Sequence, residues 1–191
     1  MGHMNIKIVP ISKNIDRKGF DCGIDELNLY LKQFAIPNDK KNIGKTFVAA
    51  LESKPDKPIG YYTVSMAQIL FTDLPDSIKK GLPKYPVPAM RIGKLAVDSH
   101  FKGMNIGSFL LKDALMRAVN ISSEVALNCV IVDALNEAAK SFYLKYGFVA
   151  FEENPLTLVI SLRKRSIIIG ETFPPPFPLS SIISAFLLNC G

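Results

Sequence analysis

Residues 95–111 read LAVDSHFKGMNIGSFLL, and this stretch decides the fold. An apolar segment ending at Val97 is typical of a buried strand, and Ile106 begins a run of apolar residues at helical spacing. Gly103 and Gly107 let the backbone of the intervening turn come close to an anion. The helix start adds unpaired amides and a positive dipole end, and Lys102 adds a full charge. The segment therefore predicts a strand, a turn and a helix that can hold a diphosphate, although two glycines in a turn also suit an ordinary connection.

The flanking sequence alternates between strand and helix patterns. We expect strands at 6–11, 46–51, 59–71, 91–98, 125–134, 148–152 and 156–162 and helices at 24–34, 106–119 and 137–146. Pro37 should end the first helix, and residues 36–45 should form a basic loop. Residues 72–88 carry four prolines, so we expect a loop there with at most one short helix near Ile78. Gly147 is a typical glycine just past a helix end. This order predicts a mixed sheet with helices on its faces.

The chain of 191 residues suits one domain. Residues 1–4 read MGHM and look like a cloning scar, so we expect the domain to span residues 5–164. Residues 165–191 are rich in proline and apolar residues and are expected to be an extension of that domain. Its apolar run at 182–188 is shorter than the roughly 20 residues that span a bilayer. We therefore expect no membrane partner.

Composition limits the chemistry that the chain can perform. His100 is the only histidine outside the scar, so metal sites and histidine-based triads are not expected. Three cysteines, at 22, 129 and 190, lie far apart and form no Cys-x-x-Cys pair, which fits a reducing cytoplasm. The formal net charge is +6, and residues 165–191 contribute none of it, because they hold one Arg and one Glu. This excess favours a polyanionic partner, or it is simply a solvated surface.

A second informative segment, residues 134–148, reads ALNEAAKSFYLKYGF. Asn136, Ala139 and Tyr143 fall on one face of the expected helix. Asn136 also suits a helix N-cap, and Phe142 also suits a core position. The phenol of Tyr143 needs a partner if it is buried.

These two segments resemble motifs A and B of the GCN5-related N-acetyltransferases (GNAT). The motif A loop of that family reads Arg/Gln-x-x-Gly-x-Gly/Ala, and Lys102, Asn105 and Gly107 stand at the matching positions. Lys102 keeps the charge but lacks the bidentate fork of arginine, and Asn105 tolerates left-handed backbone. The resemblance implies an α/β (α+β) GNAT fold, with a mixed, mostly antiparallel twisted sheet of six to seven strands and helices on both faces. It also implies acetyl-CoA as the acyl donor, without a metal.

The resemblance implies where acetyl-CoA is held. The expected contacts are Leu95, Ala96, Val97, Lys102, Gly103, Met104, Asn105, Ile106, Gly107, Ser108, Asn136, Ala139 and Phe142. The strands should splay beside residues 95–97, so that the pantetheine arm pairs with a strand edge and a backbone amide stabilises the oxyanion. Tyr143 is the candidate general acid, because a tyrosine of pKa about 10 keeps its proton at neutral pH. Asp98, Glu137 and His100 are possible bases, but each residue also suits a surface or capping role.

A third resemblance narrows the family. Residues 20–27 (FDCGIDEL), followed by Tyr30 and Leu31, and residues 90–98 (MRIGKLAVD) are similar to the TacT-like acetyltransferase toxins of bacterial type II toxin–antitoxin modules. The resemblance implies acetylation of the amino group of aminoacyl-tRNA, which blocks translation. It also implies a ribbon-helix-helix antitoxin and a homodimer. The residues expected to contact tRNA phosphates are Lys40, Lys41, Lys45, Arg91 and Lys94.

Two other functions remain open from the sequence. The first is an acetyltransferase that acts on a small-molecule or protein amine. The second is a catalytically weak acyl-CoA-binding regulatory module, which the altered motif A suggests.

Overall fold

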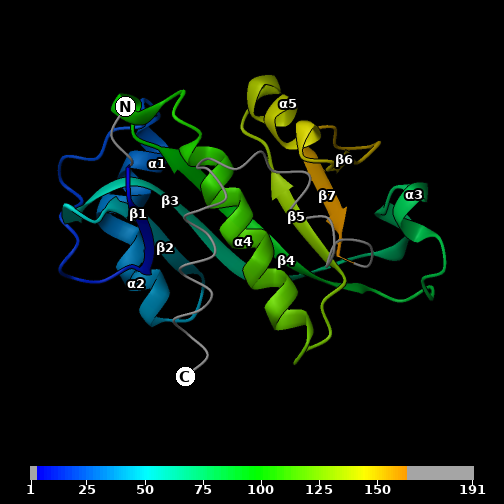
Figure 1. Cartoon of the computed structure of the whole chain (residues 1–191). Coiled ribbons are helices and arrows are strands. Elements are labelled where there is room, and N and C mark those ends of the chain that lie inside the picture. The colour runs from blue at the N-terminus through cyan, green and yellow to red at the C-terminus, as the bar shows by residue number, and fades with distance from the viewer. Residues whose placement is uncertain (1–3, 163–191) are drawn as a thin grey trace.

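One seven-stranded sheet runs through residues 4–162, the part of the chain that the computed structural model describes. The spatial order is β1-β2-β3-β4-β5-β7-β6, and only β4 and β5 run parallel (Figure 1). The strands are β1 (Ile6–Pro10), β2 (Lys45–Leu51), β3 (Lys54–Ile69), β4 (Val87–Val97), β5 (Cys129–Asp133), β6 (Val149–Ala150) and β7 (Thr157–Ser161). The expected mixed, mostly antiparallel sheet is confirmed. The expected extension at 165–191 and the first three residues of the scar lie outside the described residues.

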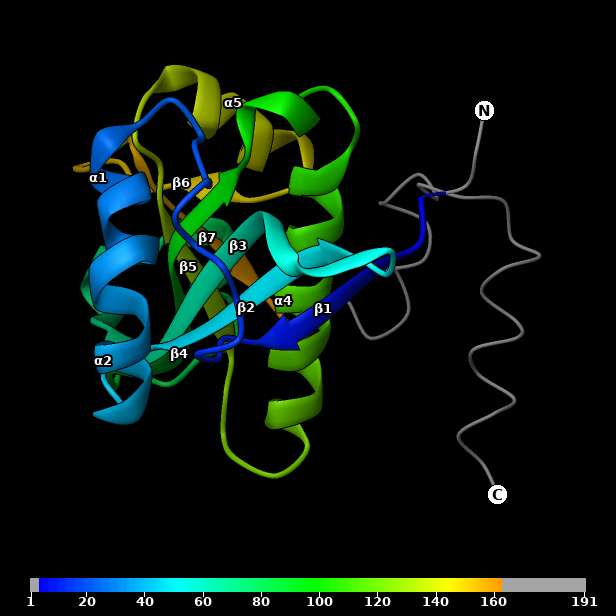
Figure 2. The same cartoon turned by 90° about the vertical axis from the view of Figure 1, so that its left-hand side faces the viewer.

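Helices cover both faces of this sheet (Figure 2). One face carries α1 (Asp25–Leu29), the π-helical turn η1 (Tyr30–Phe34) and α2 (Ala35–Lys40), which follow one another without a break. The other face carries α4 (Ile106–Ser122) and α5 (Glu137–Lys145). The elements η2 (Phe71–Asp73), α3 (Asp76–Lys79) and η3 (Ser99–Phe101) are short. Within residues 4–162, no helix combines the length and hydropathy that a membrane crossing requires.

Pro37 does not end the first helical segment, so that prediction was wrong. The amide of Ala35 bonds to the carbonyl of Tyr30, five residues back, and a new α-helix begins there. Pro37 therefore lies in the first turn of α2, where its missing N–H costs no hydrogen bond. The helix ends at Lys40, and Asn42 follows in the left-handed conformation with φ 55°. The predicted loop at 36–45 is helical over its first half.

Several strands also begin at other residues than predicted. β3 begins at Lys54 rather than Ile59, because Lys54 and Pro58 also pair with β2, through a bulged register. β4 begins at Val87 rather than Arg91, since its proline-containing start pairs with the far end of β3. β5 begins only at Cys129, and α4 extends to Ser122. Cross-strand pairing thus outweighs local propensity at these boundaries.

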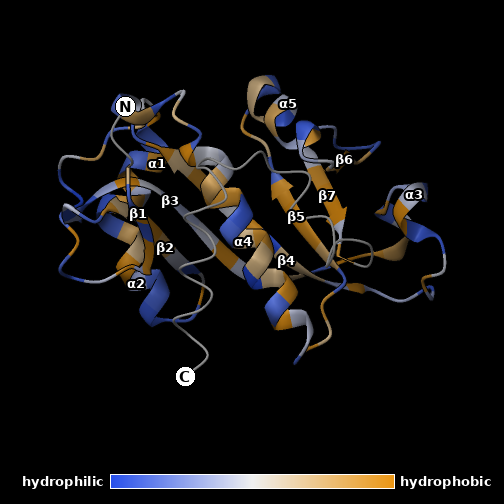
Figure 3. Cartoon of the chain, in the orientation of Figure 1, coloured by the Kyte–Doolittle hydropathy of each residue, from blue (hydrophilic) through white to orange (hydrophobic). Residues whose placement is uncertain are grey.

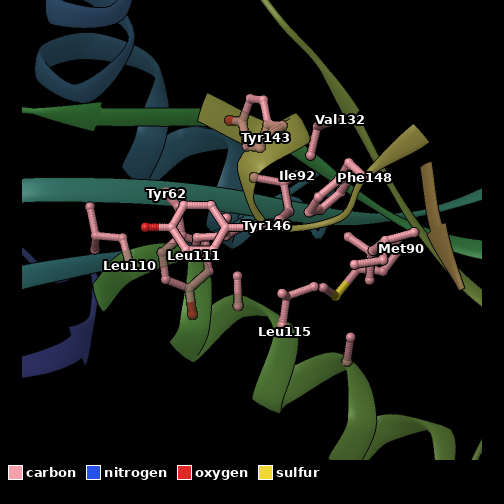
Figure 4. Close-up of a cluster of buried hydrophobic side chains, with 14 of the residues drawn as sticks. Tyr62, Met90, Ile92, Leu110, Leu111, Leu115, Val132, Tyr143, Tyr146 and Phe148 are labelled. Carbon is pink, nitrogen blue, oxygen red and sulfur yellow. The ribbon is translucent and has the colours of Figure 1, made fainter. Parts of the chain in front are cut away.

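The hydrophobic core has a layer on each side of the sheet. Beneath α4 and α5, buried side chains such as Tyr62, Met90, Leu111 and Leu115 interlock (Figure 4). Beneath α1 and η1 lies a second cluster that includes Phe20, Leu31, Val48, Tyr61 and Ala96. The short strands β5 and β7 are apolar along most of their length (Figure 3). Because β4 contributes to both layers, its backbone is fixed from two sides.

A bulge in β4 opens the sheet beside this strand. Thr63 pairs with Lys94 and Val64 with Ile92, so Gly93 is an extra residue without a partner on β3. The parallel pairing of β4 with β5 ends at the same level, at Ile92 and Val132. Beyond it, residues 93–97 have no pairing on the β5 side. The predicted splay of the strands is confirmed.

Helix α4 packs closely on β3 at Gly60. A Cβ atom at this position would lie 2.9 Å from Leu110 Cδ1, 3.0 Å from the carbonyl oxygen of Ala96 and 3.3 Å from Ile106 Cγ2. The backbone carbonyl belongs to β4 and cannot move away without disturbing the sheet. Glycine therefore sets the distance between α4 and the strands that it covers.

We predict that Gly60→Ala lowers the free energy of unfolding by about 1–3 kcal/mol, because the added methyl group overpacks the interface between helix and sheet. Equilibrium denaturation by urea measures this change. Gly19→Ala is the matched control, since its added methyl group meets nothing within 4 Å. Equal stability of the two variants would show that α4 can move outward without cost.

Candidate functional site

A groove of about 480 Å³ opens where β4 and β5 diverge. Its walls come from distant parts of the chain and are formed by Cys22, Leu27, Leu95, Ala96, Val97, Lys102, Gly107, Ala138, Ala139, Phe142 and Tyr143. The lining is mostly apolar, and Lys102 is its only charged member. Such a groove suits an extended, mainly apolar chain that carries an anionic group at one end.

The backbone of β4 offers hydrogen bonds to this groove. The amide of Asp98 donates to the carbonyl of Ile59 on β3 (3.0 Å). Because successive residues of a strand point their amides to opposite sides, Ala96 also faces β3, whereas Leu95 and Val97 face the gap. Buried polar backbone groups need partners, and a ligand that contains amides can supply them here.

The loop between β4 and α4 forms the end of the groove predicted to hold a diphosphate. Gly103 has φ 78° and Asn105 has φ 60°, so both residues are left-handed as their types permit. The first hydrogen bond of α4 is donated by the amide of Phe109 to the carbonyl of Asn105 (3.1 Å). A helix leaves its first amides without intrahelical acceptors, and here these belong to residues 106–108. The expected helix start at Ile106 is confirmed.

Several predicted contact residues can reach a ligand only through their backbone. The side chain of Ile106 is buried in the core, and the hydroxyl of Ser108 lies 2.5 Å from that of Tyr146. The side chain of Asn136 caps α5 by accepting from the amide of Ala139 (2.9 Å). Met104, in contrast, is exposed on the loop. The predicted capping role of Asn136 is confirmed.

Tyr143 lines the groove from α5 and is almost completely buried. Its ring packs edge-on against Phe142 and tilted against Phe148, and its hydroxyl points away from Val132 and Phe148 (Figure 4). Burial, with a smaller contribution from the charge of Asp133, raises the pKa of Tyr143 well above that of an ordinary tyrosine. The phenol therefore keeps its proton at neutral and moderately alkaline pH.

The sequence did not identify three residues of the groove wall. Cys22 and Leu27 come from the segment around α1, and Ala138 from α5. Burial raises the pKa of the Cys22 thiol, so it contributes shape rather than a nucleophile. Cys22 and Leu27 lie in the segment FDCGIDEL, which resembles the toxin family. The resemblance alone did not show that this segment would line the groove. The possible bases Asp98, Glu137 and His100 do not line the groove.

The five residues predicted to contact RNA do not form one continuous surface. Lys40, Lys41 and Lys45 are exposed together around the end of α2, and Lys45 pairs with Asp39 (3.3 Å). Lys94 lies over the ring of Tyr30, 4.8 Å from its centroid, and 3.6 Å from Glu26. Arg91 forms an ion pair with Asp133.

Tyr30, Gly44 and Lys94 line one shallow hollow. It lies between the segment that carries Lys40, Lys41 and Lys45 and the bulge of β4. Arg91 instead borders a different, polar hollow next to α3. Within residues 4–162, no group of three His, Cys, Asp or Glu side chains could hold a metal ion.

Comparison with known proteins agrees with this geometry. Residues 42–150 match the family described as "Acetyltransferase (GNAT) domain". The tRNA-acetylating toxin of Mycobacterium tuberculosis (strain ATCC 25618 / H37Rv) is 29% identical over 161 residues, which cover 84% of this chain and 95% of the toxin.

Solved structures of related proteins share the fold. AtaT complexed with acetyl-methionyl-tRNAfMet has a TM-score of 0.76 and 26% identity, covering 95% of this chain and 99% of that one. AtaTR bound with acetyl-CoA has a TM-score of 0.72 and 27% identity, covering 82% and 94%. The AtaT–AtaR complex bound to DNA has a TM-score of 0.64 and 26% identity, covering 81% and 93%.

We predict that Tyr143→Phe lowers kcat by about 100-fold or more while the Kd for acetyl-CoA stays within about twofold, because the ring remains and only the acidic proton is lost. Release of free thiol from acetyl-CoA measures turnover, and calorimetry measures binding. Tyr85→Phe, at an exposed tyrosine that does not line the groove, is the control. Unchanged turnover in Tyr143→Phe would remove this residue from the reaction.

Proposed function

The chain belongs to the GNAT acetyltransferase domain family and is an N-acetyltransferase that uses acetyl-CoA, and we propose that it acts as a toxin by acetylating the amino group of aminoacyl-tRNA. The observation that carries this proposal is the groove at the open edge of β4, with Tyr143 in its wall. This groove occurs in a chain that is similar, over nearly its whole described length, to a tRNA-acetylating toxin. Acetylation of charged tRNA would block translation.

The proposed acetyl-CoA site uses the groove from end to end. The amides of residues 106–108 and the ammonium group of Lys102 hold the diphosphate, with Gly103 and Asn105 shaping the turn. The amides of Leu95 and Val97 pair with the pantetheine arm, and Ala139 and Phe142 cover it from α5. The residues present therefore fit acetyl-CoA.

Two groups of the chain assist the transfer. Acetyl-CoA supplies the acetyl group as a thioester. A free backbone amide of β4 donates to the carbonyl oxygen as that oxygen gains negative charge. Tyr143 donates its proton to the departing sulfur atom, and the proton that the attacking nitrogen loses restores the phenol. An α-amino group has a pKa of about 8, so roughly a fifth of it is neutral near physiological pH, and this neutral form can attack without a strong base.

The basic residues around α2 are proposed to bind the phosphates of the tRNA. Lys40, Lys41 and Lys45 are exposed together, and Lys94 lies between this loop and the bulge of β4. An acceptor arm laid over them would bring its aminoacyl end toward the splayed strands. Arg91 borders a different hollow and would contact the RNA separately.

The proposed partners follow from the toxin function. A ribbon-helix-helix antitoxin would inactivate the enzyme, and support for a protein partner comes from the related AtaT, which forms a complex with AtaR that binds DNA. A homodimer would present two basic surfaces to one long polyanion. Because charged tRNA is used in the cytoplasm, we propose that the enzyme acts there.

The proposed substrate is tested by incubating the protein with labelled acetyl-CoA and total charged tRNA. We predict that label enters the aminoacyl group and that tRNA stripped of its amino acids takes up none. Label found only in small amines or in proteins would support a different acceptor. Acetyl-CoA binding without any acetylated product would indicate a regulatory module.

We also predict that replacing Lys40, Lys41 and Lys45 by Ala weakens tRNA binding and reduces the slope of log Kd against log salt by up to about 3, because three phosphate contacts are lost. Titrations at several salt concentrations measure this slope. The control replaces Lys13, Lys18 and Lys54, three exposed lysines that line neither the hollow at Tyr30 nor the hollow beside Arg91. Equal slopes for both triple variants would locate the RNA surface elsewhere.

A further inference from the structure

The segment before α1 crosses from one face of the sheet to the acetyl-CoA groove. Cys22 and Leu27 form part of the groove wall, although the rest of the wall comes from residues 95–143. The loop between β1 and α1 is held mostly by short turns, such as the bond from Phe20 to the carbonyl of Arg17 (3.3 Å). Cys22 must therefore be held in place by interactions outside regular secondary structure.

Asn28 fixes this segment from the helix side. Its side-chain oxygen accepts the amide of Cys22 (2.9 Å), and its side-chain nitrogen donates to Asp21 Oδ1 (2.7 Å). The same carboxylate oxygen accepts the amide of Gly23 (2.8 Å). Asn28 is buried, so each of these bonds would be costly to lose.

Asp98 fixes the segment from the side of the cofactor loop. Its Oδ2 accepts the amide of Asp21 (3.0 Å), and its Oδ1 accepts the amide of His100 (3.0 Å). The amide of Ser99 also donates to the carbonyl of Asp21 (2.8 Å). Burial alone would raise the pKa of Asp98, but these hydrogen bonds outweigh it and lower the pKa, so the carboxylate stays charged.

Lys102 lies directly over the segment held in this way. Its ammonium nitrogen is 3.5 Å from where a Cβ atom at Gly23 would stand. Gly23 is also left-handed, with φ 79°, so this position favours a residue without a side chain. The charge of Lys102 adds to the hydrogen bonds from Gly23 and Asn28 that lower the pKa of Asp21. The ammonium group thus lies beside the segment that these hydrogen bonds hold.

We propose that Asp21, Asn28 and Asp98 are positioning residues for acetyl-CoA. They hold Cys22 and Gly23 as one wall of the groove, and they place the Lys102 ammonium group at the end of the groove that receives the diphosphate. This inference rests on the use of acetyl-CoA but not on the identity of the acceptor. It assigns a physical role to the FDCG sequence at residues 20–23.

The test compares Asp21→Ala and Asn28→Leu with the wild type. We expect Kd and KM for acetyl-CoA to rise about tenfold, the usual cost of misplacing a hydrogen-bonded charge, while kcat stays within about twofold. Thr46→Val is the matched control, because it removes a buried hydroxyl that has no hydrogen-bond partner within the described residues. Its Kd should not change.

A merely structural role would give a different result. The variants would then lose thermal stability and active protein, with Kd for acetyl-CoA unchanged in the folded fraction, and the proposal would be overturned. If Asn28→Leu does not fold, Asp21→Ala alone carries the test, since Asp21 lies at the surface. Calorimetry with acetyl-CoA alone separates this inference from the proposed function. Wild-type binding without acetylation of tRNA would refute only the latter.

Discussion

The bulge at Gly93 governs how the site is built. One extra residue in β4 shifts its register on β3, and the pairing with β5 stops at the same level. The amides of Leu95 and Val97 then face a gap rather than a neighbouring strand. Backbone polar groups inside a protein need partners, so this gap favours a ligand that carries amide groups of its own. We propose that the cofactor completes a sheet that the chain leaves open.

Three distant parts of the chain meet around this gap, and each adds a different physical property. The start of α4 adds amides and a dipole that favour an anion. Helix α5 adds Tyr143, whose burial keeps the phenol protonated. The segment before α1 adds a wall, which hydrogen bonds of Asp21, Asn28 and Asp98 hold in place beside Lys102. A mostly apolar groove with one charged end results, and we propose that it receives the pantetheine arm and the diphosphate of acetyl-CoA.

Much of this could be predicted from local sequence signals. The left-handed Asn105, the capping Asn136 and the helix start at Ile106 all follow from residue type and spacing. The features that were not predicted depend on tertiary structure. Pro37 is tolerated because a π-helical turn places it at the start of a new helix. Likewise, the role of Asp98 depends on the hydrogen bond that it accepts from the amide of Asp21, at a sequence separation of 77, which no periodicity reveals.

A crystal structure of the protein with acetyl-CoA would examine the open edge of β4 itself. We expect the pantetheine amides to pair with the backbone of Leu95 and Val97, and the diphosphate to lie at the amides of residues 106–108. A cofactor bound in another hollow, with the β4 edge left to water, would contradict the role of the bulge.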